Sequence, residues 1–162
     1  MSNAPLFASS NALETSARGR IAIVLQQSLS DGLDLASQIK VAHWNLRGPF
    51  FMQLHAHFDS LYGIVSEQND TVAERLVTLG GRAQGSVRVS ARESSLAELP
   101  ELTRDRDFLR AITERLDVHL RGLRSAREVA NGEGDGDTVD VLTGIVIDLE
   151  KQGWFLRAAL DG

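Results

Sequence analysis

Residues 50–81 read FFMQLHAHFDSLYGIVSEQNDTVAERLVTLGG, and this stretch decides the fold. It contains no proline, and only one glycine precedes the closing Gly80-Gly81 pair, a common signal for the end of a helix. We therefore predict one long helix from Phe50 to Leu79. Its apolar residues recur at helical intervals: Leu54, Phe58, Leu61, Tyr62, Val65, Val72, Leu76 and Leu79.

The same helix carries two pairs of potential metal ligands. His55 and Asp59 are four positions apart, and so are Asp70 and Glu74, which places each pair on one face, one turn apart. Imidazole and carboxylate groups are ligands that iron accepts. The two pairs cannot share a metal within one chain, because their midpoints are 15 residues apart. That separation is roughly 22 Å along a helix, whereas a metal–ligand bond is roughly 2 Å.

The two pairs point in similar directions, since 15 residues leave them only about 60° apart around the helix axis. If a second copy of the helix crosses antiparallel, the first pair of one chain meets the second pair of the other. A two-fold axis near Ile64 and Val65 would then create two equivalent sites, and two-fold dimers are the commonest assembly. The sequence therefore predicts a metal site at a subunit interface.

Several segments resemble the signature of the Dps family, the ferritin-like mini-ferritins known as DNA-binding proteins from starved cells. The intervals from His43 through His55, Asp59 and Asp70 to Glu74 are 12, 4, 11 and 4 residues, and they match the ferroxidase pattern of that family. The resemblance covers most of residues 20–158. The segments that carry it are KVAHWNLRG (40–48), LHAHFD (54–59), DTVAER (70–75), LGG (79–81), DTVDVLT (137–143) and DLEKQGWF (148–155).

The resemblance implies an enzyme, a ferroxidase whose five ligands form di-iron centres between subunits, with zinc able to substitute for iron. His43 of one subunit, with Asp70 and Glu74 of the other, would hold the tighter iron. His55 and Asp59 would hold the weaker one, and Glu74 can bridge. Fe²⁺ would be oxidised by hydrogen peroxide, or by oxygen, and stored as ferric mineral in a dodecameric shell. Iron storage of this kind protects a cell from oxidative damage.

The predicted fold class is all-α, a ferritin-like four-helix bundle with a long crossover between helices 2 and 3. Ordinary ferritins build their di-iron site inside one bundle from Glu-x-x-His pairs, and this chain has none. We expect residues 1–16 to form a mobile tail and residues 17–162 to form the bundle domain. The predicted helices are 17–46, 50–79, 104–130 and 137–160, with Asp137 as an N-cap and a short helix around Leu96 in the crossover.

Composition narrows the class of protein. The chain has 162 residues, no cysteine and a net charge of −5, so disulfides are excluded and the surface repels nucleic acid. No apolar run is long enough to span a membrane, and the start lacks the features of a secretory signal. We expect a cytoplasmic protein.

The alternative function is that of a nucleoid-associated DNA-binding protein. Family members that bind DNA usually carry a lysine-rich tail, and phosphate neutralisation needs several cations. Residues 1–20 contain only Arg18 and Arg20, so DNA binding is doubtful.

Other residues have simpler interpretations. His57 lies about 200° around the helix from His55 and suits a surface or packing role, and no role is predicted for His119. We interpret Trp44 and Trp154 as core aromatics, although in the Dps family a tryptophan beside the centre intercepts oxidising equivalents. The acidic cluster before the last helix suits loop solvation and capping, or, by resemblance, an iron-entry pore at a three-fold axis; it consists of Glu133, Asp135, Asp137 and Asp140.

Overall fold

The computed structural model describes residues 6–161, and this part of the chain is helical apart from its connections. Among these residues the only β-type pairing is an isolated bridge between Arg47 and Arg104. The predicted all-α class is therefore confirmed. In chain order the helices are α1 (Thr15–Asn45), α2 (Phe51–Thr78), α3 (Val87–Glu93), α4 (Asp105–Gly132) and α5 (Gly136–Leu160).

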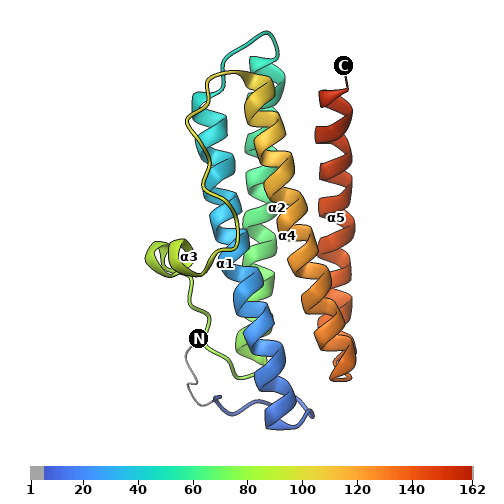
Figure 1. The fold of residues 1–162 in the computed structure, drawn as a ribbon. Helices are drawn as coiled ribbons and strands as arrows, with labels where there is room; N and C mark the ends of the chain where they lie inside the picture. The colour runs from blue at the N-terminus through green and yellow to red at the C-terminus, as the bar shows by residue number, and fades with distance from the viewer. Residues whose placement is uncertain (1–5, 162) are drawn as a thin grey trace.

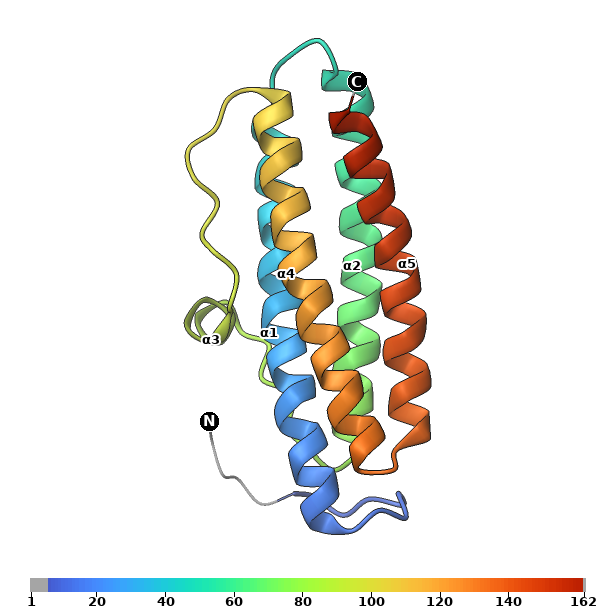
Figure 2. The ribbon, with the colours of Figure 1, turned by 45° about the vertical axis from the view of Figure 1, so that its right-hand side comes forward.

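The four long helices stand side by side, as Figures 1 and 2 show. A short turn joins α1 to α2, which runs back antiparallel. The connection from α2 to α4 then travels the length of the bundle, with α3 standing beside α1, so that α4 runs parallel to α2 and α5 parallel to α1 (Figure 1). This is the ferritin-like bundle with a long crossover that the sequence predicts.

A continuous apolar core lies between the four long helices. Each helix contributes the stripe of residues that its helical periodicity places on one face, and burial of that stripe supplies the main driving force for packing. The largest fully buried side chains include Ile21, Leu25, Leu35, Ile39, Phe58, Leu61, Leu76, Phe108, Leu109 and Ile112.

The turn after α1 is locked by Asp105, a buried carboxylate at the start of α4. Asp105 accepts hydrogen bonds from the backbone N–H groups of Phe50 and Arg106, each at 2.8 Å. Gly48 has a φ of +156°, and a Cβ there would lie 2.2 Å from this carboxylate, so only glycine fits. The lock fixes how α2 leaves α1, and hence how His43 meets α2.

The crossover is bound to α1 by side chains of that helix. Gln27 donates to the carbonyl of Glu93 at 2.9 Å, and the Asp31 carboxylate accepts from the backbone N–H of Ser95 at 2.7 Å. The helix predicted around Leu96 is wrong in position: it forms at residues 87–93, and Leu96 is instead a buried anchor in non-helical chain.

Two further expectations differ from the structure. The N-cap of α5 is Asp135, whose side chain accepts from the Thr138 N–H at 3.2 Å; Asp137 already lies in the first turn. Trp44 and Trp154 are not core residues of this chain, because they are 67% and 64% exposed. Mobility of residues 1–16 stays a prediction, and residues 1–5 of this tail lie outside the described residues. No helix within residues 6–161 is both long and apolar enough to cross a membrane.

Candidate metal centre

His43, near the end of α1, and His55, in the second turn of α2, form a stacked pair. Their ring centroids are 3.7 Å apart and the rings are inclined by 22°. The His43 Nδ1 donates to the carbonyl of His55 at 2.8 Å, and the His55 Nδ1 donates to the carbonyl of His43 at 2.9 Å. Each histidine therefore fixes the other through the backbone of the neighbouring helix.

This reciprocal bonding determines which nitrogen is available to a metal. A carbonyl oxygen can only accept, so Nδ1 of each ring carries the proton, and Nε2 of the neutral ring keeps its lone pair. Metal-binding histidines commonly use their second nitrogen in this way, since the hydrogen bond fixes ring orientation and tautomer. Phe51 stacks on His55 with a centroid distance of 5.1 Å and further restrains that ring. The His43 and His55 side chains are both half-buried.

Asp59 lies one turn along α2 from His55 and forms an ion pair with Lys40 of α1. The Lys40 ammonium also sits 4.8 Å from the centre of the Tyr62 ring. The hydrogen bond from Lys40, reinforced by its charge, lowers the pKa of the exposed Asp59 carboxyl. Asp59 is thus ionised and held by a cation where a metal ion is expected.

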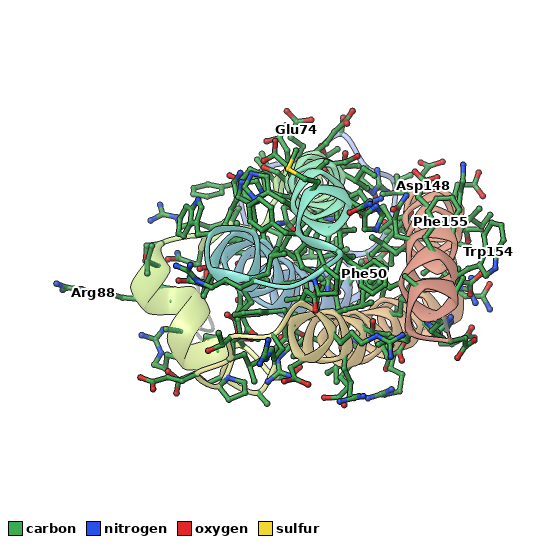
Figure 3. All side chains as sticks on the ribbon, turned by 90° about the horizontal axis from the view of Figure 1, so that it is seen from above. Phe50, Glu74, Arg88, Asp148, Trp154 and Phe155 are labelled. Atoms are coloured by element: carbon green, nitrogen blue, oxygen red, sulfur yellow. The ribbon has the colours of Figure 1, made fainter. Side chains whose placement is uncertain are left out.

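Asp70 and Glu74 lie toward the opposite end of α2, and both are exposed. Figure 3 shows Glu74 projecting from the outer side of α2, away from α4 and α5. The Glu74 backbone carbonyl accepts from the Thr78 hydroxyl at 2.8 Å. No basic residue among residues 6–161 forms an ion pair with either carboxylate, whereas Asp59 has Lys40.

One chain brings only part of the predicted site together. His43, His55 and Asp59 gather at one end of α2, while Asp70 and Glu74 remain on the same helix at the other. Within residues 6–161 no cluster of three or more histidine or acidic side chains is close enough to hold a metal ion. The ligand types suit iron, but a complete set would require ligands from another chain.

Sequence reasoning missed Lys40, because its contact with Asp59 spans 19 positions and two helices. His57 packs edge-on against Phe155, with centroids 6.4 Å apart, which agrees with a packing role. His119, to which the sequence assigned nothing, is buried, and burial lowers its pKa to about 4.

The acidic side chains near the start of α5 are only partly available to bind cations from solution. Glu133 forms an ion pair with Arg20 at 2.5 Å, and Asp135 is buried against Arg75 at 2.7 Å. Burial would raise the pKa of Asp135, but hydrogen bonds from Thr138 and Arg75 outweigh this effect and lower it. Asp137 and Asp140 are exposed.

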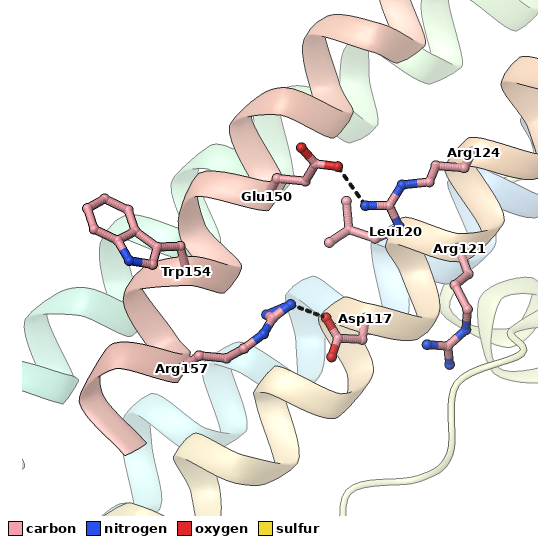
Figure 4. Close-up of a pocket in the computed structure, with 7 residues that line it drawn as sticks. All are labelled: Asp117, Leu120, Arg121, Arg124, Glu150, Trp154 and Arg157. Atoms are coloured by element: carbon pink, nitrogen blue, oxygen red, sulfur yellow. Dashed lines mark hydrogen bonds and ion pairs between the residues drawn. The ribbon is translucent and has the colours of Figure 1, made fainter. Parts of the chain in front are cut away.

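A shallow hollow between α4 and α5 is a poor alternative site (Figure 4). Four of its five charged residues pair across the two helices: Arg124 with Glu150 at 2.6 Å, and Arg157 with Asp117 at 3.0 Å. The hollow contains none of the predicted ligands.

Comparison with known proteins places this geometry in a family. The ferritin-like domain family matches residues 24–162. The DNA protection during starvation protein of Agrobacterium fabrum is 36% identical over 149 residues, which are 91% of this chain and 92% of that protein. The chain is therefore a ferritin-like protein.

Solved structures agree with this assignment. DpsA14 of Streptomyces coelicolor superposes with a TM-score of 0.89 at 34% identity, over 97% of this chain and 95% of that one. The Dps protein of Vibrio cholerae, described as a member of a superfamily of ferritin-like diiron-carboxylate proteins, gives 0.88 at 26% identity, over 98% and 99%. The chain belongs to the Dps family.

Proposed function

We propose that this protein is an iron-storage and detoxification protein, a ferroxidase that oxidises Fe²⁺ at di-iron sites shared between two subunits and stores the ferric product in a dodecameric shell. Membership of the Dps family supports the general role. The observation that carries the finer proposal is the division of five suitable ligands between the two ends of α2: His43 of α1 joins His55 and Asp59 at one end, and Asp70 and Glu74 lie toward the other.

The exposed face of α2 suits close approach of a second α2. Ala56, Ser60 and Gly63 are exposed and follow each other at intervals of four and three residues, so they share one face. A Cβ at Gly63 would have no neighbour within 4 Å. Small side chains along the middle of the helix leave room for an antiparallel copy, which would carry its Asp70 and Glu74 to the histidine end of the first chain.

In this proposal the histidines and carboxylates act as a rigid binding surface for Fe²⁺, the substrate. The Nε2 lone pairs of His43 and His55 are already oriented by their Nδ1 hydrogen bonds, so little conformational freedom is lost on binding. Three carboxylates offset the charge of the metal ions. Two Fe²⁺ give one electron each to one hydrogen peroxide, whose O–O bond breaks, and the Fe³⁺ ions are hydrolysed to mineral.

A mixing experiment tests the shared site. His43→Ala/His55→Ala protein and Asp70→Asn/Glu74→Gln protein are each expected to lack fast Fe²⁺ oxidation. In a heterodimer one of the two sites regains all its ligands, so random 1:1 exchange restores about a quarter of the sites. Subunit exchange is verified by native mass spectrometry. Exchanged assemblies with no recovered Fe²⁺ oxidation would exclude the shared site.

DNA binding is the second candidate, because relatives are named DNA protection during starvation proteins. The described contacts do not favour a tail-mediated mechanism. The two cations of residues 1–20 are both engaged, since Arg18 is buried and donates to the Leu79 carbonyl at 2.9 Å and Arg20 pairs with Glu133.

We expect weak or no retention of plasmid DNA by metal-free protein in chelator at roughly 0.15 M salt. Each subunit carries a net charge of −5, and salt screens this repulsion without creating attraction. Tight, chelator-resistant binding that is lost on deletion of residues 1–20 would favour the nucleoid role.

A further inference from the structure

The segment before α1 is bonded to the end of α2. The last carbonyls of a helix have no partners within it, and here three consecutive carbonyls are satisfied from the N-terminal side. Ser9 Oγ donates to Thr78 O at 2.6 Å, Arg18 Nη1 to Leu79 O at 2.9 Å, and Phe7 N to Gly80 O at 2.7 Å. We call residues 7–18 the α2 clamp; Phe7 and Ser9 precede α1, and Arg18 lies in its first turn.

The clamp depends on a close backbone approach at Gly80. This residue has a φ of +90°, and a Cβ there would lie 2.5 Å from the backbone oxygen of Phe7. Any other residue would be strained and would collide with the clamp. The Phe7 ring is capped in turn by Arg82, whose guanidinium carbon is 5.5 Å from the ring centre. The clamp is therefore held by both backbone and side-chain contacts.

The clamped turn adjoins a proposed iron ligand. Glu74 is one turn before Thr78, and the Thr78 hydroxyl donates to the Glu74 carbonyl at 2.8 Å. The carbonyl of Thr78 itself accepts from Ser9. Helix ends fray when their terminal carbonyls lack partners, and fraying of this turn would loosen the backbone that carries Glu74.

We propose that the α2 clamp is a positioning element for the iron site, with Ser9 and Phe7 holding the Glu74 end of α2 in a fixed geometry for metal binding. The inference rests on the proposed function, because it takes Glu74 as a ligand. In this proposal the segment before α1 acts by stabilising the protein near the iron site, and not by binding DNA.

The test uses the assembled protein with Co²⁺ alone as the probe. Binding is measured by titration calorimetry and by the visible absorption of bound Co²⁺. The clamp variant is Phe7→Pro/Ser9→Ala, which removes a backbone donor and a hydroxyl donor. Ser9→Thr keeps the hydroxyl. The matched control is Ser94→Ala, which removes a hydroxyl that donates to Asp34 at 2.6 Å, on the crossover and away from α2.

We expect the clamp variant to bind Co²⁺ about three- to tenfold more weakly, the effect of losing one or two modest hydrogen bonds. Amide exchange over residues 74–81 should accelerate in parallel. Ser9→Thr should retain the parental affinity, and Ser94→Ala should bind Co²⁺ as the parent does. Native mass spectrometry confirms that every variant remains assembled.

Three results would overturn the proposal: unchanged amide exchange in the clamp variant, faster exchange with a Co²⁺ affinity within twofold of the parent, or an equal loss in Ser94→Ala. Asp70→Asn/Glu74→Gln separates this failure from that of the site itself. If that variant binds Co²⁺ as the parent does, the proposed iron site is wrong and the clamp has no ligand to position.

Discussion

His119 provides a direct test of how the interior of this bundle controls stability. It lies on α4, is 4% exposed, and its Nδ1 has no hydrogen-bond partner among the described residues. Burial lowers its pKa from 6.5 to about 4, while the nearby negative charge of Asp31 acts in the opposite direction. The folded protein therefore keeps this imidazole neutral at pH values where the unfolded chain protonates it.

The sign of the pH effect follows from this difference. A lowered pKa means that the unfolded chain binds the proton more tightly than the folded protein does. The contribution of His119 to the free energy of unfolding therefore falls as the pH decreases below 6.5, and it levels off near pH 4. The contribution of His119 to this loss is on the order of 1 kcal/mol at pH 5.5 and roughly 2–3 kcal/mol at pH 4.5. Above pH 7 it is negligible.

The perturbation is His119→Leu, which removes the titrating group and fills a similar volume. At pH 7 its stability should lie within about 1 kcal/mol of the parent, because the lost Nδ1 had no partner. At pH 4.5 the variant should be the more stable protein by roughly 2–3 kcal/mol relative to that baseline. Guanidinium unfolding at fixed protein concentration, at pH 7, 5.5 and 4.5, measures the difference.

His57→Gln is the matched control, because burial also lowers the pKa of His57 but this residue is only half-buried. Its pH-dependent effect should be smaller than that of His119→Leu. Carboxyl groups titrate equally in parent and variant and cancel in the comparison. A difference between parent and His119→Leu that stays constant from pH 7 to 4.5 would refute the assignment of His119 as a buried neutral imidazole.

Two further predictions concern ion pairs. In Lys40→Met, the pKa of Asp59 should rise toward its ordinary value of 3.8, as measured by carbon NMR titration of the carboxyl. Co²⁺ should also bind more tightly at the Asp59 end of α2. If neither the pKa nor the Co²⁺ affinity changes, the Lys40–Asp59 contact is contradicted. In Arg75→Met, the buried Asp135 loses two hydrogen bonds of 2.7 and 3.0 Å. The free energy of unfolding should then fall by about 1–3 kcal/mol, and Arg75→Lys should recover part of it in guanidinium unfolding.

The long helices, and the placement of the two proposed ligand pairs along α2, were predictable because both depend on local periodicity. The predicted helix of residues 50–79 matches α2, Phe51–Thr78, since its apolar stripe and terminal glycines are readable along the chain. The His43–His55 stacking was not predictable. It depends on the crossing of α1 and α2, which the buried Asp105 helps to fix from a third helix.

The crossover shows why a single apolar residue is a weak guide to secondary structure. Leu96 suggested a short helix, but it reaches the core from non-helical chain, next to Ser95, whose N–H is bound by Asp31. The helix that does form, VRVSARE, is only seven residues long and buries just Ser90. A seven-residue helix has little intrinsic stability, so its position is set by how the flanking chain is attached to α1.

Periodicity also cannot tell whether an apolar residue is buried by its own chain or by another. Trp44 follows the helical pattern of α1 yet is 67% exposed, and Met52 at the start of α2 is 73% exposed. The end of α1, the start of α2 and the end of α5 lie at the same end of the bundle (Figure 2). Exposed apolar side chains of this size are available for contact with another chain. The proposed ligand set would call for a second chain for a different reason, the separation of its two parts along α2. Packing and chemistry therefore both indicate that the single bundle is an incomplete unit, and a variant that remains a folded monomer should bind Co²⁺ weakly even with all five ligands intact.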